Sequence, residues 1–575
     1  MAQSRRDVLK MAMSGLGVMA TSGPLTQLAR GDVQSSAARS SIGAGDVKAD
    51  VVIIGAGMGG VAAALAALRN GLSVVLTEET DWIGGQLTSQ AVPPDEHPHI
   101  ESHGANQSYR EFRERVRDYY RRNYPLTKQA RENPKLNPGN GTVSRLCHEP
   151  RVALAVLYEM LAPWLSSGKL TLLLETVPEN AEVSGDQVQS VSVRNLRSGD
   201  VTALQAPHFI DASELGDLLP LTQTEFVMGA ESKAETGELH AAEKADPLNQ
   251  QAFTMCFAAE YRPGEDHTID RPAEYTFWRD FVPEMSPPWS GKLLDLTYSS
   301  PRDLTPKKLS FDPTLAPTPT LNLFRYRQLK HSAFYEPGHD ATNITLVNWP
   351  QNDYVLGPLV GVTAEEKAKH IARATQLSLS LMYWLQTEVP RPDGGTGYPG
   401  LKLRGDLLGS DTGVAKYPYV RESRRIQALF TIKEEHVGRD NRAMVMGVPT
   451  KDAKAAEFAD SVGIGYYHID LHPSSAGNNY IDFQSLPFQI PLRSLIPKRV
   501  TNLLAANKNI GTTHITNGCY RLHPVEWGIG EAAGSLVAFQ LRNRKTSHQI
   551  AGSEKLIAEL QQDLRRQGIE LRWPA

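Results

Sequence analysis

The residues best suited to chemistry lie in a short stretch near the end of the sequence. Positions 514 to 523 carry two imidazoles, a phenol and a guanidinium, namely His514, Tyr520, Arg521 and His523. Imidazoles and phenols transfer protons, and a guanidinium stabilises negative charge that develops on oxygen. We expect His523 to act as a general base and Arg521 to orient substrate oxygens. The competing interpretations are that His514 is a core histidine and that His523, followed by Pro524, only ends an extended segment.

A second candidate set is the run Arg421-Glu422-Ser423-Arg424-Arg425. On a strand, Arg421 and Arg425 would share one face and Arg424 would lie on the other. We expect Arg421 to bind substrate oxygens or a cofactor. The alternative, that these arginines pair with Glu422 or with helix ends, is equally compatible with the sequence.

A third set has the residue types of metal ligands at close spacing: Asp95, Glu96, His97, His99, Glu101 and His103. Carboxylates and imidazoles bind divalent cations. We interpret this set as pocket lining or surface and predict no metal site. The three cysteines include no Cys-x-x-Cys pair, so they are too few for an iron–sulfur cluster or a thiolate zinc site.

The elements that would position these residues begin with a nucleotide fingerprint. An apolar strand over 50–54 leads into Gly55-Ala56-Gly57-Met58-Gly59-Gly60, and an alanine-rich helix and a second strand follow. Gly55 permits a tight turn, Gly57 lets the backbone approach a pyrophosphate, and Gly60 lets helix and strand pack closely. Glu78 ends the second strand and is placed to accept ribose hydroxyls, with Glu79 as the alternative. The fingerprint predicts dinucleotide binding without a 2′-phosphate.

Three further segments extend this pattern: Gly-Gly-Gln-Leu-Thr at 84–88, Arg-Glu-Ser-Arg-Arg at 421–425 and Gly-Glu-Ala-Ala-Gly at 530–534. With them the chain resembles the bacterial FAD-dependent oxidoreductase family over residues 49–545. The resemblance implies that FAD is the cofactor. It implies FAD contacts by the glycines of the fingerprint, including Gly59, and by Gly84, Gly85, Gln86, Leu87, Asp211, Ala212, Ser213, Ala506, Asn507, Gly530, Glu531 and Ala532. Ala506-Asn507 departs from the Gly-Arg usual in related proteins.

The resemblance also implies the fold class. We expect an α/β fold with a glutathione-reductase-like, discontinuous FAD-binding Rossmann domain over 46–225 and 485–575. An inserted α+β substrate domain would occupy 226–484. Within it, residues 321–327 and 343–349 read as strands and residues 363–387 as a long helix capped by Thr363. In the FAD-binding part, the turns at 184–186 and 197–200 predict a small antiparallel ribbon. A helix opening at Gly528 would point its N-terminus at the flavin, with residues 514–523 beside the reacting atoms.

The expected function is hydride transfer between flavin N5 and a small organic substrate of alcohol or amine type, by a dehydrogenase or oxidase. The alternatives are a flavin-dependent reductase of activated C=C bonds and a non-catalytic, FAD-stabilised binding protein. The electron acceptor, whether oxygen, a quinone or a redox protein, is not indicated. The net charge of −4 over 575 residues argues against nucleic acid as a partner.

The first 45 residues read as an export signal and linker. Arg5-Arg6 followed by an apolar, small-residue stretch resembles a twin-arginine signal, which implies recognition by the twin-arginine machinery and a periplasmic or secreted protein. The stretch is too broken by glycine and proline to form a stable membrane span.

Overall fold

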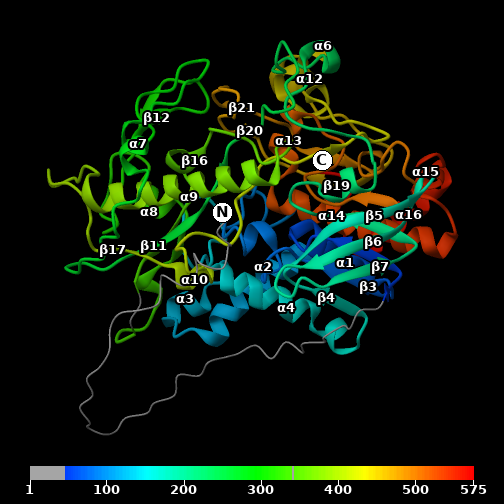
Figure 1. Ribbon diagram of the computed structural model, residues 1–575, viewed down its shortest axis with the longest axis horizontal. Coiled ribbons are helices and arrows are strands. Elements are labelled where there is room, and N and C mark those ends of the chain that lie inside the picture. Colours follow the sequence, from blue (N-terminus) through cyan, green and yellow to red (C-terminus); the bar gives the residue numbers. More distant parts are fainter. Residues whose placement is uncertain (1–45, 340–341, 575) are drawn as a thin grey trace, which may run out of the picture. The chain divides into compact units, whose positions relative to one another are not determined.

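A five-stranded parallel sheet with strand order β23-β8-β2-β3-β4 organises the fold. Two of its strands, β3 and β4, are labelled close to helix α1 (Met58–Arg69) in Figure 1. Its strands are β2 (Val51–Ile54), β3 (Val74–Thr77), β4 (Leu170–Leu173), β8 (His208–Asp211) and β23 (Leu503–Ala505). All residues of β2 and β3 are buried, which explains why their sequences are continuous apolar runs rather than alternating ones. The sheet therefore joins three distant parts of the chain, because β8 pairs with β2 on one side and with β23 on the other.

The structure is a computed structural model that describes residues 46–339 and 342–574. The predicted export signal and linker over 1–45 lie outside the described residues.

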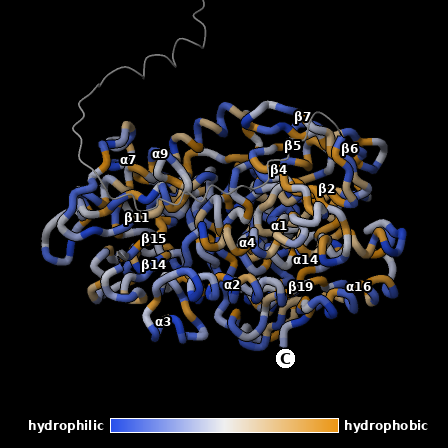
Figure 2. Tube along the Cα trace, turned by 90° about the horizontal axis from the view of Figure 1, so that it is seen from below, coloured by the Kyte–Doolittle hydropathy of each residue, from blue (hydrophilic) through white to orange (hydrophobic). Residues whose placement is uncertain are grey.

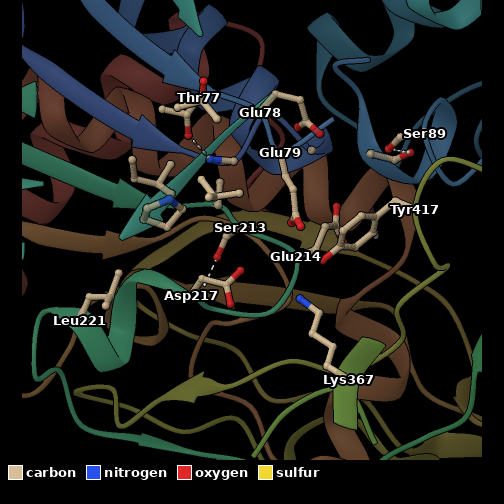
Figure 3. A pocket seen from close by; sticks show the side chains of 18 residues that line it. Thr77, Glu78, Glu79, Ser89, Ser213, Glu214, Asp217, Leu221, Lys367 and Tyr417 are labelled. Atoms are coloured by element: carbon tan, nitrogen blue, oxygen red, sulfur yellow. Dashed lines mark hydrogen bonds between the residues drawn. The ribbon is translucent and has the colours of Figure 1, made fainter. Parts of the chain in front are cut away.

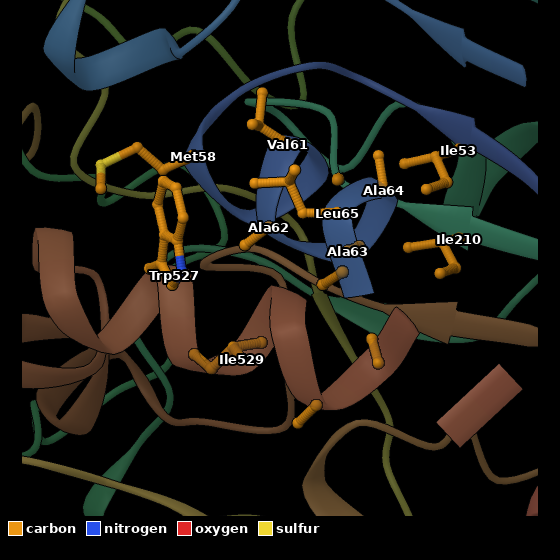
Figure 4. Close-up of a cluster of buried hydrophobic side chains, with 14 of the residues drawn as sticks. Ile53, Met58, Val61, Ala62, Ala63, Ala64, Leu65, Ile210, Trp527 and Ile529 are labelled. Atoms are coloured by element: carbon orange, nitrogen blue, oxygen red, sulfur yellow. The ribbon is translucent and has the colours of Figure 1, made fainter. Parts of the chain in front are cut away.

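Two long helices cover the sheet next to the glycine fingerprint. Helix α1 (Met58–Arg69) packs along α14 (His523–Asn543), and nearly every residue of both is buried (Figure 4). Their backbones nearly touch, since a Cβ on Gly530 would lie 2.0 Å from the Gly59 carbonyl oxygen and one on Gly534 would lie 2.1 Å from that of Ala63. Only glycine permits so close an approach at these two positions.

The predicted start of helix α14 is wrong. The sequence interpretation placed it at Gly528, but α14 begins at His523, with Pro524 in its first turn. Proline fits the first turn because its missing N–H is not needed there. The Gly-Glu-Ala-Ala-Gly segment consequently lies inside α14 and packs on α1 instead of forming the helix N-terminus.

A twisted ribbon lies beside the parallel sheet. It comprises β5 (Thr176–Ser184), β6 (Gln187–Asn195) and β7 (Val201–Gln205), which pair antiparallel as the two turns in the sequence predict. The short β1 (Val47–Lys48) adds to β7 in parallel. Figure 2 shows hydrophobic residues gathered around β2 and hydrophilic ones at the periphery, for example on α3 (Lys128–Glu132).

The region between residues 226 and 484 builds a second sheet and a second core. The sheet has the order β14-β15-β11-β17, with β11 (Phe257–Tyr261), β14 (Gln328–Lys330), β15 (Ile344–Val347) and β17 (Leu401–Leu403). The long helix α9 (Ala364–Thr387) is capped by Thr363 through a capping box with Glu366, as its sequence predicts. The strand expected over 321–327 is wrong, because Asn322 caps a helical turn, α8 (Leu323–Tyr326), by accepting from the Phe324 N–H.

The remaining elements are shorter or peripheral. The helices are α2 (Gln107–Asn123), α4 (Pro150–Ser166), α5 (Leu218–Leu221), α6 (Lys233–Thr236), α7 (Tyr275–Asp280), α10 (Gly405–Leu408), α11 (Glu434–Val437), α12 (Arg439–Met446), α13 (His514–Tyr520), α15 (Ser547–Ala551) and α16 (Glu554–Arg566). The strands are β9 (Phe226–Val227), β10 (Phe253–Thr254), β12 (Thr297–Ser299), β13 (Pro306–Lys308), β16 (Asp353–Tyr354), β18 (Arg425–Ile426), β19 (Ser461–Gly465), β20 (Ile469–Leu471), β21 (Ile481–Phe483) and β22 (Phe488–Pro491). Among the described residues, no helix has the length and apolar character needed to cross a bilayer.

The glycine contact between α1 and α14 yields a stability prediction. Gly534→Ala should destabilise the protein by about 1–3 kcal/mol, because the added methyl group overpacks against the Ala63 carbonyl. Gly528→Ala in the same helix is the matched control: its Cβ would meet nothing closer than 3.7 Å, and alanine favours the helix by up to about 1 kcal/mol. Denaturant unfolding measures both, and equal midpoints for the two variants would contradict the packing argument.

Candidate functional site

A first pocket opens at the carboxyl ends of β2, β3 and β8, where parallel strands bring their following loops to one edge. It encloses about 910 Å³ of empty space that is partly open to solvent. Its walls include residues predicted to bind the cofactor: Gly55, Gly57, Glu78, Glu79, Gly85, Ala212 and Ser213. Figure 3 shows Glu79, Glu214 and Tyr417 pointing toward one another, with Lys367 directed to the same side from α9.

The glycine loop shapes the floor of this pocket. Gly55 has a φ of +96°, and a Cβ there would lie 2.4 Å from the Ala212 carbonyl oxygen. At Gly57 and Gly85, by contrast, a Cβ would meet the Glu214 carboxylate, 2.7 Å from its Oε1. That oxygen is buried and has no hydrogen-bond partner among the described residues. At Gly57 the nearest atom is therefore the end of a side chain, whereas a Cβ at Gly85 would also lie 2.9 Å from the backbone Cα of Gly57.

Glu78 lies at the end of β3 with its carboxylate buried beside the glycine loop. Its Oε2 accepts from the Ala56 N–H at 3.2 Å, and Oε1 accepts from the Thr80 hydroxyl at 2.8 Å. Burial raises the pKa of Glu78 to about 8, and burial also raises the pKa of its neighbour Glu79. Both acids line the pocket, so the choice between them as ribose ligand stays open.

Several predicted cofactor residues lie behind the pocket wall and support it. Asp211 accepts from the Ser213 N–H at 3.0 Å, and Asn507 donates to the Ala212 carbonyl at 3.1 Å, so both hold the loop that follows β8. Glu531 binds Arg69, Asn106 and Ser108 in the packed helix layer. The others are buried in the helix contact or the adjoining segments and are absent from the pocket lining: Gly59, Gly60, Gly84, Leu87, Ala506, Gly530 and Ala532.

A buried charge network adjoins the glycine loop. Lys508 binds the Glu214 carboxylate at 2.6 Å and lies 3.6 Å from that of Glu526. Gln86 donates to Glu526 at 2.7 Å and to the Arg521 carbonyl at 3.0 Å. Sequence reasoning missed Lys508. Lys508 directly follows Asn507, a predicted cofactor residue, and this position could have identified it.

A second pocket, with about 940 Å³ of empty space, lies where Arg421 and Arg521 meet. Arg421 donates to the Ala252 carbonyl at 2.7 Å and forms an ion pair with Asp353 at 3.0 Å. Arg521 forms an ion pair with Asp470 at 3.2 Å. The structure therefore brings together the two arginines that the sequence analysis selected from segments 100 residues apart.

This pocket also contains histidines that the sequence analysis missed. His468, Asp470 and His472 alternate along the chain around β20, so a strand places them on one face. His472 Nδ1 lies 2.6 Å from Asp353, and Asp353 and Asp470 outweigh burial and Arg421 to raise the pKa of His472. His468 Nε2 lies 3.6 Å from Asp482. The alternating Tyr466–His472 sequence was the signal that could have identified them.

The three other predicted catalytic residues point elsewhere. His523 is fully buried, and its Nδ1 accepts from the Asp95 N–H at 3.0 Å. Burial lowers its pKa to about 4, so the ring is neutral and carries its proton on Nε2, which leaves no free lone pair for a base. His514 is held by Glu422 at 2.9 Å, and the Tyr520 hydroxyl donates to the Gln489 carbonyl at 2.8 Å. None of the three lines either pocket among the described residues.

The possible metal cluster is instead a set of ion pairs. Asp95 binds Arg327 at 3.1 Å, Glu96 binds Arg113 at 2.9 Å, and Glu101 binds Arg113 at 2.7 Å. The guanidinium groups occupy the carboxylate oxygens that a cation would need.

One extended segment joins the two pockets. Tyr417 lines the first pocket, whereas Tyr419 and Arg421 line the second. Four extended residue steps span at most about 14 Å. The backbone positions of Tyr417 and Arg421, one in each pocket lining, are therefore no farther apart than this.

No curated protein sequence matches this chain. Solved structures that resemble it include L-proline dehydrogenase from P. horikoshii, at 17% identity and a TM-score of 0.18, which covers 32% of this chain and 24% of that one. An E. coli quinol fumarate reductase FrdA variant (11% identity, TM-score 0.32) covers 91% of this chain and 74% of that one. The OxyS anhydrotetracycline hydroxylase from Streptomyces rimosus is 11% identical with a TM-score of 0.30, and the match covers 90% of this chain and 66% of that one. Scores this low carry no argument about activity.

The family comparison is decisive. The model of the family described as FAD dependent oxidoreductase matches residues 50–564, a span that includes both pockets and all five strands of the parallel sheet. The chain therefore belongs to the FAD-dependent oxidoreductase family, and it is an enzyme whose cofactor is FAD.

Proposed function

We propose that this enzyme transfers a hydride between FAD and a small organic substrate of alcohol or amine type bound in the second pocket. The observation that carries the proposal is the shared segment Tyr417–Arg421, which lines both pockets. The nucleotide end of the cofactor fits the first pocket, and the reacting groups meet where this segment enters the second.

The residues of the first pocket fit FAD. At Gly57 the free carboxylate oxygen of Glu214 is the nearest atom that a Cβ would meet, and the N-terminus of α1 directs N–H groups to the same place. The buried Gln86 Oε1 and Gln90 Nε2 have no hydrogen-bond partners among the described residues. Gly55, Gly57, Ser213 and Glu78 would hold the nucleotide part, and Gln86 and Gln90 would hold the flavin side. When bound, FAD supplies a two-electron acceptor for a hydride.

In this proposal the chain's own residues orient the substrate and move its proton. Arg421 and Arg521 orient substrate oxygens, because each is fixed by a carboxylate partner. His468 takes the hydroxyl or amine proton, oriented by Asp482 at 3.6 Å. His468 replaces His523 as the proposed base because it lines the pocket and the lone pair of His523 is already used.

Reduction of activated C=C bonds is the second candidate. It is favoured by His472, which lies 2.6 Å from Asp353: Asp353 and Asp470 raise its pKa against burial and Arg421, and so favour the protonated ring that can donate a proton. Anaerobic mixing separates the two: alcohols or amines should bleach the oxidised flavin, whereas enoates should restore the colour of the reduced flavin.

We also propose the domain arrangement expected from the sequence. A glutathione-reductase-like FAD domain would combine 46–225 with 485–575, and 226–484 would form the inserted substrate domain. One large hydrophobic cluster lies around the parallel sheet and another around β11 and α9, which supports the division, although the first cluster also includes Ile426, Val462 and Leu471 of the inserted range.

The first prediction concerns cofactor binding. Gly57→Ala should fold normally, because its Cβ meets only the mobile end of Glu214, but it should bind FAD at least about tenfold more weakly, because the methyl group blocks close approach of the pyrophosphate. Bound flavin per protein and the melting temperature are measured, with Gly528→Ala as the control. Full FAD binding by Gly57→Ala would show that the cofactor lies elsewhere.

The second prediction concerns the base. His468→Gln should keep its FAD but reduce flavin about 10²–10⁴-fold more slowly. His523→Gln is the matched comparison, and where it retains FAD it should reduce flavin at nearly the normal rate. Stopped-flow absorbance with counted bound flavin provides the readout. Slower flavin reduction in His523→Gln than in His468→Gln would indicate that His523 is the base.

The third prediction concerns export, which we propose proceeds by the twin-arginine route to the periplasm or beyond. Replacing both Arg5 and Arg6 by Lys should leave the flavin-loaded protein in the cytoplasm, because the paired guanidinium groups form the recognition element. Cell fractionation with flavin fluorescence measures the outcome. Normal periplasmic levels of the double variant would rule out this route.

A further inference from the structure

The second pocket has a composition that identifies the class of its ligand. Six aromatic rings line it: Tyr298, Tyr326, Trp349, Tyr419, Tyr467 and Tyr480. Aromatic faces pack against the C–H groups of a flat or ring-shaped ligand. Polar side chains are placed among them, an arrangement typical of pockets that fix a small molecule's orientation. The charge of the polar groups therefore decides which ligand fits.

The charges in this pocket are balanced. Three arginines line it, Arg327, Arg421 and Arg521, and three aspartates line it as well, Asp95, Asp470 and Asp482. Each arginine already has a carboxylate partner: Arg327 binds Asp95 at 3.1 Å, Arg521 binds Asp470 at 3.2 Å, and Arg421 binds Asp353 at 3.0 Å. An anionic ligand would add a charge where no unpaired guanidinium is available, at a high cost in desolvation.

Hydrogen-bonding capacity is nevertheless left over. The Nε atoms of Arg327, Arg421 and Arg521, the Nδ2 of Asn348 and the hydroxyl of Tyr480 are buried and have no hydrogen-bond partner within the described ranges. All five belong to residues that line the pocket. Unpaired buried donors are rare, so a ligand that brings several oxygen acceptors would satisfy them.

Acceptors are also present. Asp482 faces the pocket with His468 at 3.6 Å as its closest charged partner among the described residues. A hydroxyl group suits both requirements, because its oxygen accepts from the N–H groups while its proton is donated to a carboxylate. A carboxylate only accepts at neutral pH.

We propose that the second pocket binds a neutral polyhydroxylated compound, a sugar or a sugar-derived polyol, with its hydroxyls on the arginine, Asn348 and Tyr480 donors and on Asp482 and its C–H faces on the aromatic rings. This assignment deepens the proposed hydride transfer and rests on the same pocket. It specifies that the reacting group is one hydroxyl among several.

Calorimetric titration of the FAD-loaded protein under anaerobic conditions tests the assignment. The probes are D-glucose, D-sorbitol and myo-inositol, with D-gluconate and succinate as acidic counterparts; sorbitol and gluconate differ only at one end. At least one neutral probe should bind, at least about tenfold more tightly than either acid, with an affinity that does not change with salt. Binding of the acids alone, or of none of the neutral probes, overturns the assignment.

Tyr480→Phe is the informative variant. It removes a hydroxyl that has no hydrogen-bond partner among the described residues, so stability should hardly change, while affinity for the neutral ligand should fall about tenfold. Tyr383→Phe on α9, outside the pocket lining, is the matched control. Unchanged affinity in Tyr480→Phe would contradict the proposed contact.

The same titration separates this assignment from hydride transfer, because flavin absorbance is recorded alongside the heat. Binding of a neutral probe without bleaching would support the ligand class and contradict the hydride transfer. Bleaching of the flavin by an acid, without binding of a neutral probe, would support the hydride transfer and contradict the ligand class.

Discussion

The backbone contact between α1 and α14 is the constraint on which the rest of the structure depends. Gly59 and Gly530 approach so closely that no side chain fits between them, and the same holds between Ala63 and Gly534. The start of α1 carries the glycine loop of the first pocket, and Arg521, immediately before α14, lines the second. Because the two helices are held without freedom to slide, the positions of both pockets are fixed relative to each other.

Around this contact the fold keeps almost every buried charge paired. Lys508 lies between Glu214 and Glu526, and each arginine of the second pocket has its own aspartate. An ion left unpaired in such surroundings is strongly destabilising, so these pairs constrain which charges a ligand can bring. The unpaired hydrogen-bond donors differ from these ion pairs, because a hydrogen bond to them makes binding directional without a change in net charge.

The sequence predicts what depends on local spacing. The strand–glycine–helix unit, the antiparallel ribbon and the cap of α9 are all confirmed, because each is determined by neighbouring residues. Prediction from the sequence fails where segments that are distant along the chain meet in the fold. His468 and His472 belong to a two-stranded hairpin whose approach to Arg521 depends on tertiary packing. The misplaced start of α14 is a local error, since Pro524 at the first turn was visible in the sequence.

Glu214 links the cofactor to these buried charges. Its free oxygen lies where the glycine loop would receive a pyrophosphate, and its other oxygen binds Lys508. Two like charges in contact repel, so a pyrophosphate bound there would require the Glu214 side chain to turn away from Gly57. Lys508 also lies beside Glu526 and, through it, Gln86. The carboxylate beside the glycine loop and the polar groups around Gln86 therefore belong to one buried network, which Glu526 attaches to α14.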